Sequence, residues 1–100
     1  MTIYYFTFEA IPCSDNPEKD DCEGAFINCW VDSIDVNLAL TKASNYINDE
    51  GWEVTNIEDQ FIANRKQYEG DYKLKESLEC FDHAMSDGIA AIFYTWSYDD

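Results

Sequence analysis

Two segments of the sequence repeat apolar residues at spacings of four, three and four, and each is followed by a glycine. The first set consists of Val36, Leu40, Ala43 and Ile47. The second set consists of Leu74, Leu78, Phe81 and Met85. Such spacing lines one face of a helix, and a glycine tolerates the left-handed conformation that ends it. We therefore predict helices over about 35–50, ended by Gly51, and over about 73–86, ended by Gly88.

Four other segments alternate large apolar residues with smaller or polar ones, which is typical of strands. They cover residues 2–11, 25–33, 52–57 and 89–97. Whether the third strand continues or rebends through 61–63 stays open at this point. The predicted order is β-β-α-β-α-β.

This order favours one α+β domain over residues 1–100, an open-faced sandwich that is ferredoxin-like in character. A ferredoxin-like domain itself has the order β-α-β-β-α-β. Because strand–helix–strand crossovers are right-handed, we expect both helices on one face of a four- or five-stranded sheet. The other face would then expose tryptophan, phenylalanine and tyrosine, which predicts a homodimer. In the alternative, the loop over 13–24 half-buries these aromatic residues.

The charge balance narrows the classes of partner. Twenty-one acidic and six basic residues give a formal net charge of −15, while 46% hydrophobic and 16% aromatic residues exclude a disordered acidic tail. Such a field repels phosphate backbones and anionic lipids, so we expect no nucleic acid and no membrane as partner. No secretory signal and no apolar run of roughly 18 residues is visible, which favours the cytoplasm.

The surplus charge and the aromatic strands together predict a surface for a basic protein. Flexible acidic segments accelerate association with basic proteins, and exposed aromatic residues are frequent hot spots. The predicted acidic contacts lie in and beside the loop: Asp15, Glu18, Asp20, Asp21 and Glu23. The predicted aromatic contacts lie on the strands: Tyr5, Trp30, Tyr94 and Trp96.

Residue types that carry catalysis are present but do not form a known pattern. The only histidine, His83, is three residues from Cys80, which does not give the geometry of a catalytic triad. The acidic loop lacks the glycine and the ligand spacing of a calcium loop, and no pair of cysteines has zinc-ligand spacing. We therefore predict no catalytic residue, no metal and no cofactor. A disulfide between Cys13 and Cys22 stays open.

The C-terminal half resembles a pattern found in small bacterial α+β proteins of unassigned function. The resemblance rests on Gly51-Trp52-Glu53-Val54, on Phe81-Asp82-His83-Ala84 before Asp87-Gly88, and on Phe93-Tyr94-Thr95-Trp96. These residues cap helices or supply core aromatic rings. The resemblance implies a fold and carries no activity.

Three functions are consistent with these features. The first is an acidic, non-enzymatic protein-interaction module, such as an inhibitor or immunity-type partner of a basic protein. The second is a small-molecule-binding or catalytic domain, with its site between the aromatic sheet face and a dimer mate. The third is a structural subunit of a larger assembly. Net charge and exposed aromatic residues favour the first.

Overall fold

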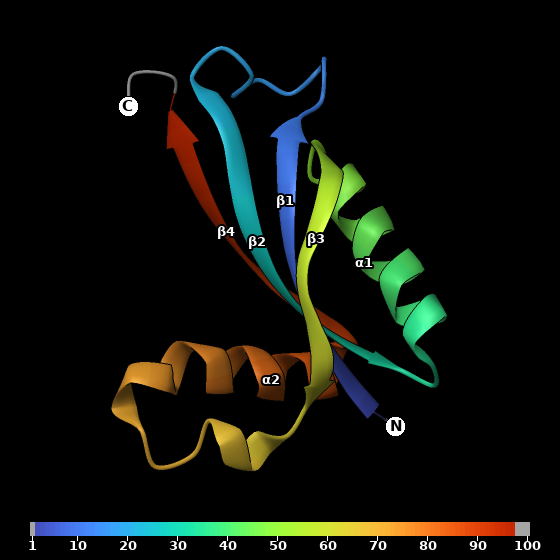
Figure 1. Cartoon of the computed structure of the whole chain (residues 1–100), viewed down its shortest axis with the longest axis vertical. Helices are drawn as coiled ribbons and strands as arrows, with labels where there is room; N and C mark the ends of the chain where they lie inside the picture. Colours follow the sequence, from blue (N-terminus) through green and yellow to red (C-terminus); the bar gives the residue numbers. More distant parts are fainter. Residues whose placement is uncertain (1, 98–100) are drawn as a thin grey trace.

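A computed structural model describes residues 2–97 of the chain (Figure 1). Its elements, in chain order, are β1 (Thr2–Pro12), β2 (Cys22–Ser33), α1 (Val36–Asp49), β3 (Trp52–Ala63), the short 3-10 helices η1 (Arg65–Gln67) and η2 (Tyr72–Leu74), α2 (Lys75–Asp87) and β4 (Ile89–Ser97). The predicted order β-β-α-β-α-β is confirmed. The third strand continues through 61–63 and does not rebend.

The four strands form one antiparallel sheet in the order β3-β1-β2-β4. The hairpin of β1 and β2 occupies the centre, and each edge strand follows a helix. Residues 2–97 contain no fifth strand. The domain is therefore α+β with a four-stranded sheet, and its element order differs from that of a ferredoxin-like domain.

The expectation that both helices lie on one face is wrong. Neighbouring residues of β1 belong to different core clusters: Phe6 packs with residues of α1, whereas Ile3 and Tyr5 pack with residues of α2. Because side chains alternate between the faces of a strand, the two helices cover opposite faces. The rule of right-handed crossovers applies to parallel strands. It constrains α1, which joins the parallel strands β2 and β3, but not α2, which joins the antiparallel strands β3 and β4.

Local signals in the sequence set the C-terminal ends of both helices, as predicted, and also the start of α1. The Asp35 carboxylate caps α1 by accepting a hydrogen bond from the Leu38 backbone amide at 2.8 Å. Gly51 and Gly88 follow the two helices with φ angles of 93° and 95°, a conformation that glycine adopts without a Cβ clash. Each glycine leads directly into an edge strand.

The face under α1 is the more completely closed one, and we call it the α1 face. Phe6, Phe8 and Ile27 of the sheet have no exposed surface, and neither do Ala43 and Ile47 of the helix. Burial of each large apolar side chain stabilises the fold by about 2 kcal/mol. Small alanines on α1 let the helix approach the two phenylalanines of β1 closely.

The opposite face, the α2 face, is closed at one end only. There Trp30 of β2, Phe81 of α2 and Tyr68 form a buried cluster with Ala84 and Ala90. The Trp30 indole Nε1 donates a hydrogen bond to the Tyr68 hydroxyl at 3.1 Å, which satisfies a buried donor. This cluster holds α2 against the sheet.

Candidate protein-binding surface

The greater part of the α2 face is left uncovered because α2 runs across the strands at one end of the sheet (Figure 1). A strand of 12 residues such as β2 is about 40 Å long. A helix that crosses it covers about 10–12 Å of that length. The remaining part of the α2 face is the candidate site. This part is uncovered because of where α2 crosses the strands, and the sequence of the strands does not determine it.

The uncovered area, which we call the open patch, draws side chains from all four strands. Its members are Thr7, Glu9, Phe26, Asn28, Asn56, Asp59, Tyr94 and Trp96. Phe26 lies opposite Tyr94 in the register of β2 and β4, and both rings are more than 40% exposed. Glu9 is the neighbour of Phe26 on β1. Two aromatic rings and one carboxylate therefore share one row of the sheet.

Trp96 is held in place at the far end of the open patch. Its indole Nε1 donates to the Glu23 carboxylate at 3.1 Å, and its ring lies 4.9 Å from that of Phe26. The ring rests over Gly24, where an added Cβ would lie 2.4 Å from it. Glycine is needed at this position because the indole occupies the space of a side chain.

The predicted aromatic residues separate into accessible and inaccessible ones. Trp30 is only 1% exposed beneath α2, so it is not part of the accessible surface. Tyr5 is half-buried at the border, where its ring stacks on Phe61 at 4.6 Å and its hydroxyl accepts a hydrogen bond from Thr7 at 2.8 Å. Burial raises the pKa of Tyr5. Tyr94 and Trp96 are the predicted residues that the open patch brings together.

Tyr94 links the open patch to α2. Its hydroxyl donates to the Glu76 carboxylate at 3.3 Å. Burial and the charge of Glu76 both raise the pKa of Tyr94. The phenol therefore stays protonated at neutral pH and remains a hydrogen-bond donor.

The acidic loop lies at the end of the sheet opposite α2 and near the end of β4 (Figure 1). Asn16 anchors it: its side-chain Nδ2 donates to the Gly51 carbonyl at 2.6 Å, and its Oδ1 accepts from the Glu18 amide. Four of the predicted acidic contacts are exposed there: Asp15, Glu18, Asp20 and Asp21. The fifth, Glu23, belongs to β2 and holds Trp96. Phe26 and Tyr94 of the open patch are 43% and 48% exposed, so the loop does not bury them.

The charged side chains on the strands are all acidic. The strands contain six carboxylates: Glu9, Glu23, Asp32, Glu53, Glu58 and Asp59. They contain no lysine, arginine or histidine. Arg65, outside the strands, is already paired with Asp82 at 3.0 Å and with Glu69. Its guanidinium lowers the pKa of Asp82. The open patch therefore presents negative charge without cations of its own on the sheet.

All four cysteines are free, so Cys13 and Cys22 are not bonded in this structure. Burial, followed by the charges of Glu76 and Glu79, raises the pKa of Cys80, which disfavours the thiolate that nucleophilic attack requires.

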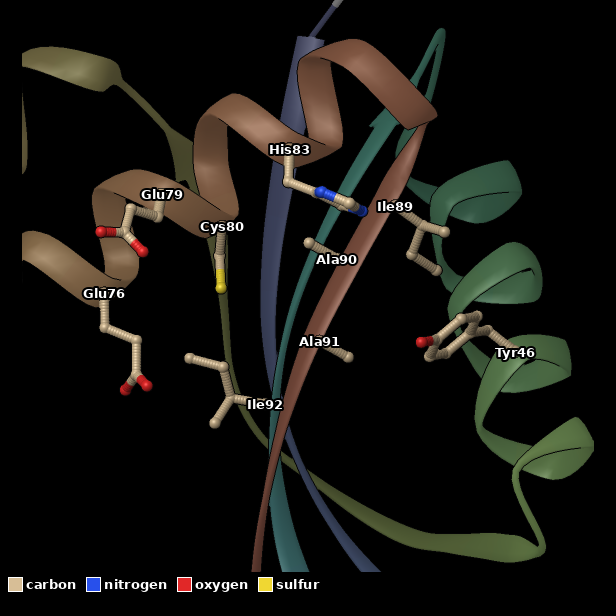
Figure 2. Close-up of a pocket in the computed structure, with 9 residues that line it drawn as sticks. All are labelled: Tyr46, Glu76, Glu79, Cys80, His83, Ile89, Ala90, Ala91 and Ile92. Atoms are coloured by element: carbon tan, nitrogen blue, oxygen red, sulfur yellow. The ribbon is translucent and has the colours of Figure 1, made fainter.

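His83 pairs with Asp87 at 3.0 Å on the same helix. It lines a shallow groove of about 380 Å³ beside β4, together with Cys80 (Figure 2). Residues 2–97 hold no cluster of three or more histidine, cysteine or acidic side chains that could bind a metal. No helix in the same part of the chain is long and apolar enough to cross a membrane.

Among the predicted contacts only Tyr94 and Trp96 belong to the open patch, so sequence reasoning missed its other members, and it also missed their neighbour Glu76. Phe26 was recognised as a strand residue, but its exposure depends on where α2 crosses. Glu76 reads as an ordinary acid in the first turn of a helix, and its contact with Tyr94 joins residues 18 apart in the chain. Comparisons of the chain with protein-family models, with curated proteins and with solved structures found no match. The resemblance to small bacterial proteins stays a prediction.

Proposed function

We propose that this domain is a non-enzymatic protein-interaction module that receives a basic surface of a partner protein on the open patch. The observation that carries the proposal is one row of the sheet in which the carboxylate of Glu9 is in register with two exposed aromatic residues, Phe26 and Tyr94, on strands without basic residues. Arginine and lysine side chains combine favourably with such a surface because they stack on aromatic rings and pair with carboxylates.

The acidic loop supports the same proposal through the rate of association. The loop between β1 and β2 lies at the end of the sheet opposite α2 (Figure 1), and its exposed acids, Asp15, Glu18, Asp20 and Asp21, extend the negative field beyond the open patch. Charges of this kind accelerate the encounter with a basic protein and lose their effect as salt rises. An inhibitor or immunity-type protein that covers a basic active site or binding surface needs fast association of this kind.

The proposal is tested by capture of basic proteins from host lysate, at about 50 and about 500 mM salt, followed by purification of each captured protein and measurement of its dissociation constant. We expect the double variant Phe26→Ser with Tyr94→Ser to bind at least about tenfold more weakly, as hot-spot aromatics do. Tyr72→Ser is the matched control because Tyr72 is 85% exposed outside the open patch. Equal affinities for the two variants, or no salt-sensitive basic partner, would refute the proposal.

The alternative is a small-molecule or catalytic site between the open patch and a second copy of the chain. The grooves in the described residues are open, so this alternative requires a homodimer to close one. Analytical ultracentrifugation at micromolar concentration separates the two functions. Sedimentation as a species of 11.6 kDa only would remove the alternative and the predicted homodimer together.

A further inference from the structure

The two edge strands of the sheet differ in how they are protected against pairing with another strand. β3 has two register irregularities against β1 and carries Glu53, Glu58 and Asp59. Bulges and charges are the usual means by which an edge strand avoids an added strand. The nine residues of β4 include no charged residue and no proline, and the one irregularity in its pairing with β2 lies at the far end, between Cys22 and Gly24, whereas the register is regular from Gly24 to Val31.

The groove of about 380 Å³ runs along this unprotected edge. It is lined by four consecutive residues of β4, Ile89, Ala90, Ala91 and Ile92, whose side chains alternate between the two faces. Figure 2 views the sheet from this edge, with β4 in front, α2 on one side and α1 on the other. A groove that wraps both faces at four successive residues has the edge of the strand itself as its floor.

The walls of the groove are mainly acidic on the α2 side. Glu76 and Glu79 lie one helical turn apart beside Cys80, and Tyr46 of α1 forms the opposite wall (Figure 2). At the Gly88 end, the groove contains His83 with its partner Asp87, and Lys42 of α1 lies close to Gly88. The negative charge that lines the groove therefore comes mainly from Glu76 and Glu79, in the first half of α2.

On the basis of the proposed function, we propose that the basic partner contributes an extended segment that adds to β4 as a fifth strand. The backbone of the added segment would pair with the edge of β4, as in other cases of strand addition. Its alternate side chains would lie on the α2 face beside Ile92 and Tyr94, within reach of Glu76 and Glu79. Lysine or arginine at these alternate positions would form ion pairs with the carboxylates of the acidic wall.

A second copy of the chain is a poorer occupant of the same edge. Pairing β4 with β4 would bring together two chains that each carry a net charge of −15. It would also place two copies of the acidic wall beside one another. A basic strand removes that repulsion.

The test uses the whole domain and a synthetic ten-residue peptide that alternates lysine with valine, blocked at both ends. Binding is followed by NMR at about 50 and about 300 mM salt. We expect saturable binding that weakens with salt, contacts between peptide and β4 backbone protons, and slowed solvent exchange of amides in 89–97. Two further versions of the peptide carry methyl groups on every second backbone nitrogen, one at the odd positions and one at the even positions. At least one of them should bind more weakly, because a methylated nitrogen cannot donate a hydrogen bond.

Charge variants locate the site. We expect Glu76→Gln with Glu79→Gln to weaken peptide binding about fivefold, from the loss of two exposed ion pairs. The matched control Glu53→Gln with Glu58→Gln removes the same charge from the β3 edge, outside the open patch, and should change the dissociation constant by less than about twofold. Equal effects of the two double variants would overturn the assignment to β4.

The remaining outcomes separate this inference from the proposed function. Peptide contacts confined to Glu9, Phe26 and Asn56, without contacts along the β4 backbone, would overturn strand addition and leave the open patch as the binding surface. Absence of saturable binding would also overturn strand addition, while capture with Phe26→Ser alone tests the open patch independently, because Phe26 lies on β2 and not on the β4 edge. Slow exchange of β4 amides without peptide, in a species of twice the monomer mass, would assign the edge to a second copy.

Discussion

Large side chains alternate along the strands and occur on both faces of the sheet, but the helices cover more of them on one face than on the other. On the α1 face, Phe6, Phe8 and Ile27 have no exposed surface. On the α2 face, Trp30 is buried, whereas Phe26, four residues earlier on the same strand, is 43% exposed. The difference lies in the direction of the covering helix relative to the strands. One face therefore supplies most of the stability, and the other has surface available for a partner.

The largest expected effect tests this division directly. Phe6→Ala should lower the free energy of unfolding by about 3–5 kcal/mol, because it opens a cavity in a fully buried site. Phe26→Ala should cost about 1 kcal/mol, since the ring already contacts water. Urea denaturation of the two variants measures the difference. Similar losses would mean that the open patch contributes to the fold as much as the closed core does.

The second prediction concerns the thiol within the α1 face. Burial raises the pKa of Cys29 from 9.0 to about 12. Because the folded value lies above the unfolded one, the stabilising contribution is complete below pH 9 and is lost as the pH rises toward 12. We expect the wild-type free energy of unfolding to fall by about 2 kcal/mol between about pH 8 and about pH 10.5 from this group.

Cys29→Ala should remove that part of the pH dependence, although it lowers the stability at neutral pH. Cys13→Ser is the control, because Cys13 lies at the start of the loop and is not part of the core. Urea unfolding at several alkaline pH values gives both slopes. An unchanged slope in the Cys29 variant would show that alkaline destabilisation has another origin.

The helices and strands could be predicted from the sequence, but the strand residues that each helix covers could not. Asp35, Gly51 and Gly88 act through their own backbone neighbours, so the helix ends could be read locally. Trp30 and Trp96 occupy equivalent places in the alternation and could not be told apart. Their difference depends on where α2 crosses, which is set by contacts such as Trp30 with Tyr68, 38 residues apart. The acidic loop was predicted as exposed, but its anchor at Gly51 was not.

The third prediction tests how firmly α2 is fixed at its end of the face. Tyr68→Phe removes the acceptor of the buried Trp30 indole N–H and should cost about 1–2 kcal/mol. Tyr72→Phe, at an 85% exposed tyrosine in the same segment, should change stability by less than about 0.5 kcal/mol. Urea denaturation of both variants provides the comparison. Equal stabilities would mean that water replaces the lost acceptor and that the covered end is looser than the contacts indicate.

The smallest expected effect lies at the border between the covered end and the open patch. Tyr94→Phe removes the exposed hydrogen bond to Glu76 and should change stability by less than about 0.5 kcal/mol. In Glu76→Gln the pKa of Tyr94 should fall toward its ordinary value, because the nearby carboxylate is one cause of its rise. NMR of ring-labelled tyrosine follows that titration. A loss above about 1.5 kcal/mol in Tyr94→Phe would mean that Tyr94 is committed to the fold and is not free to change partners on binding.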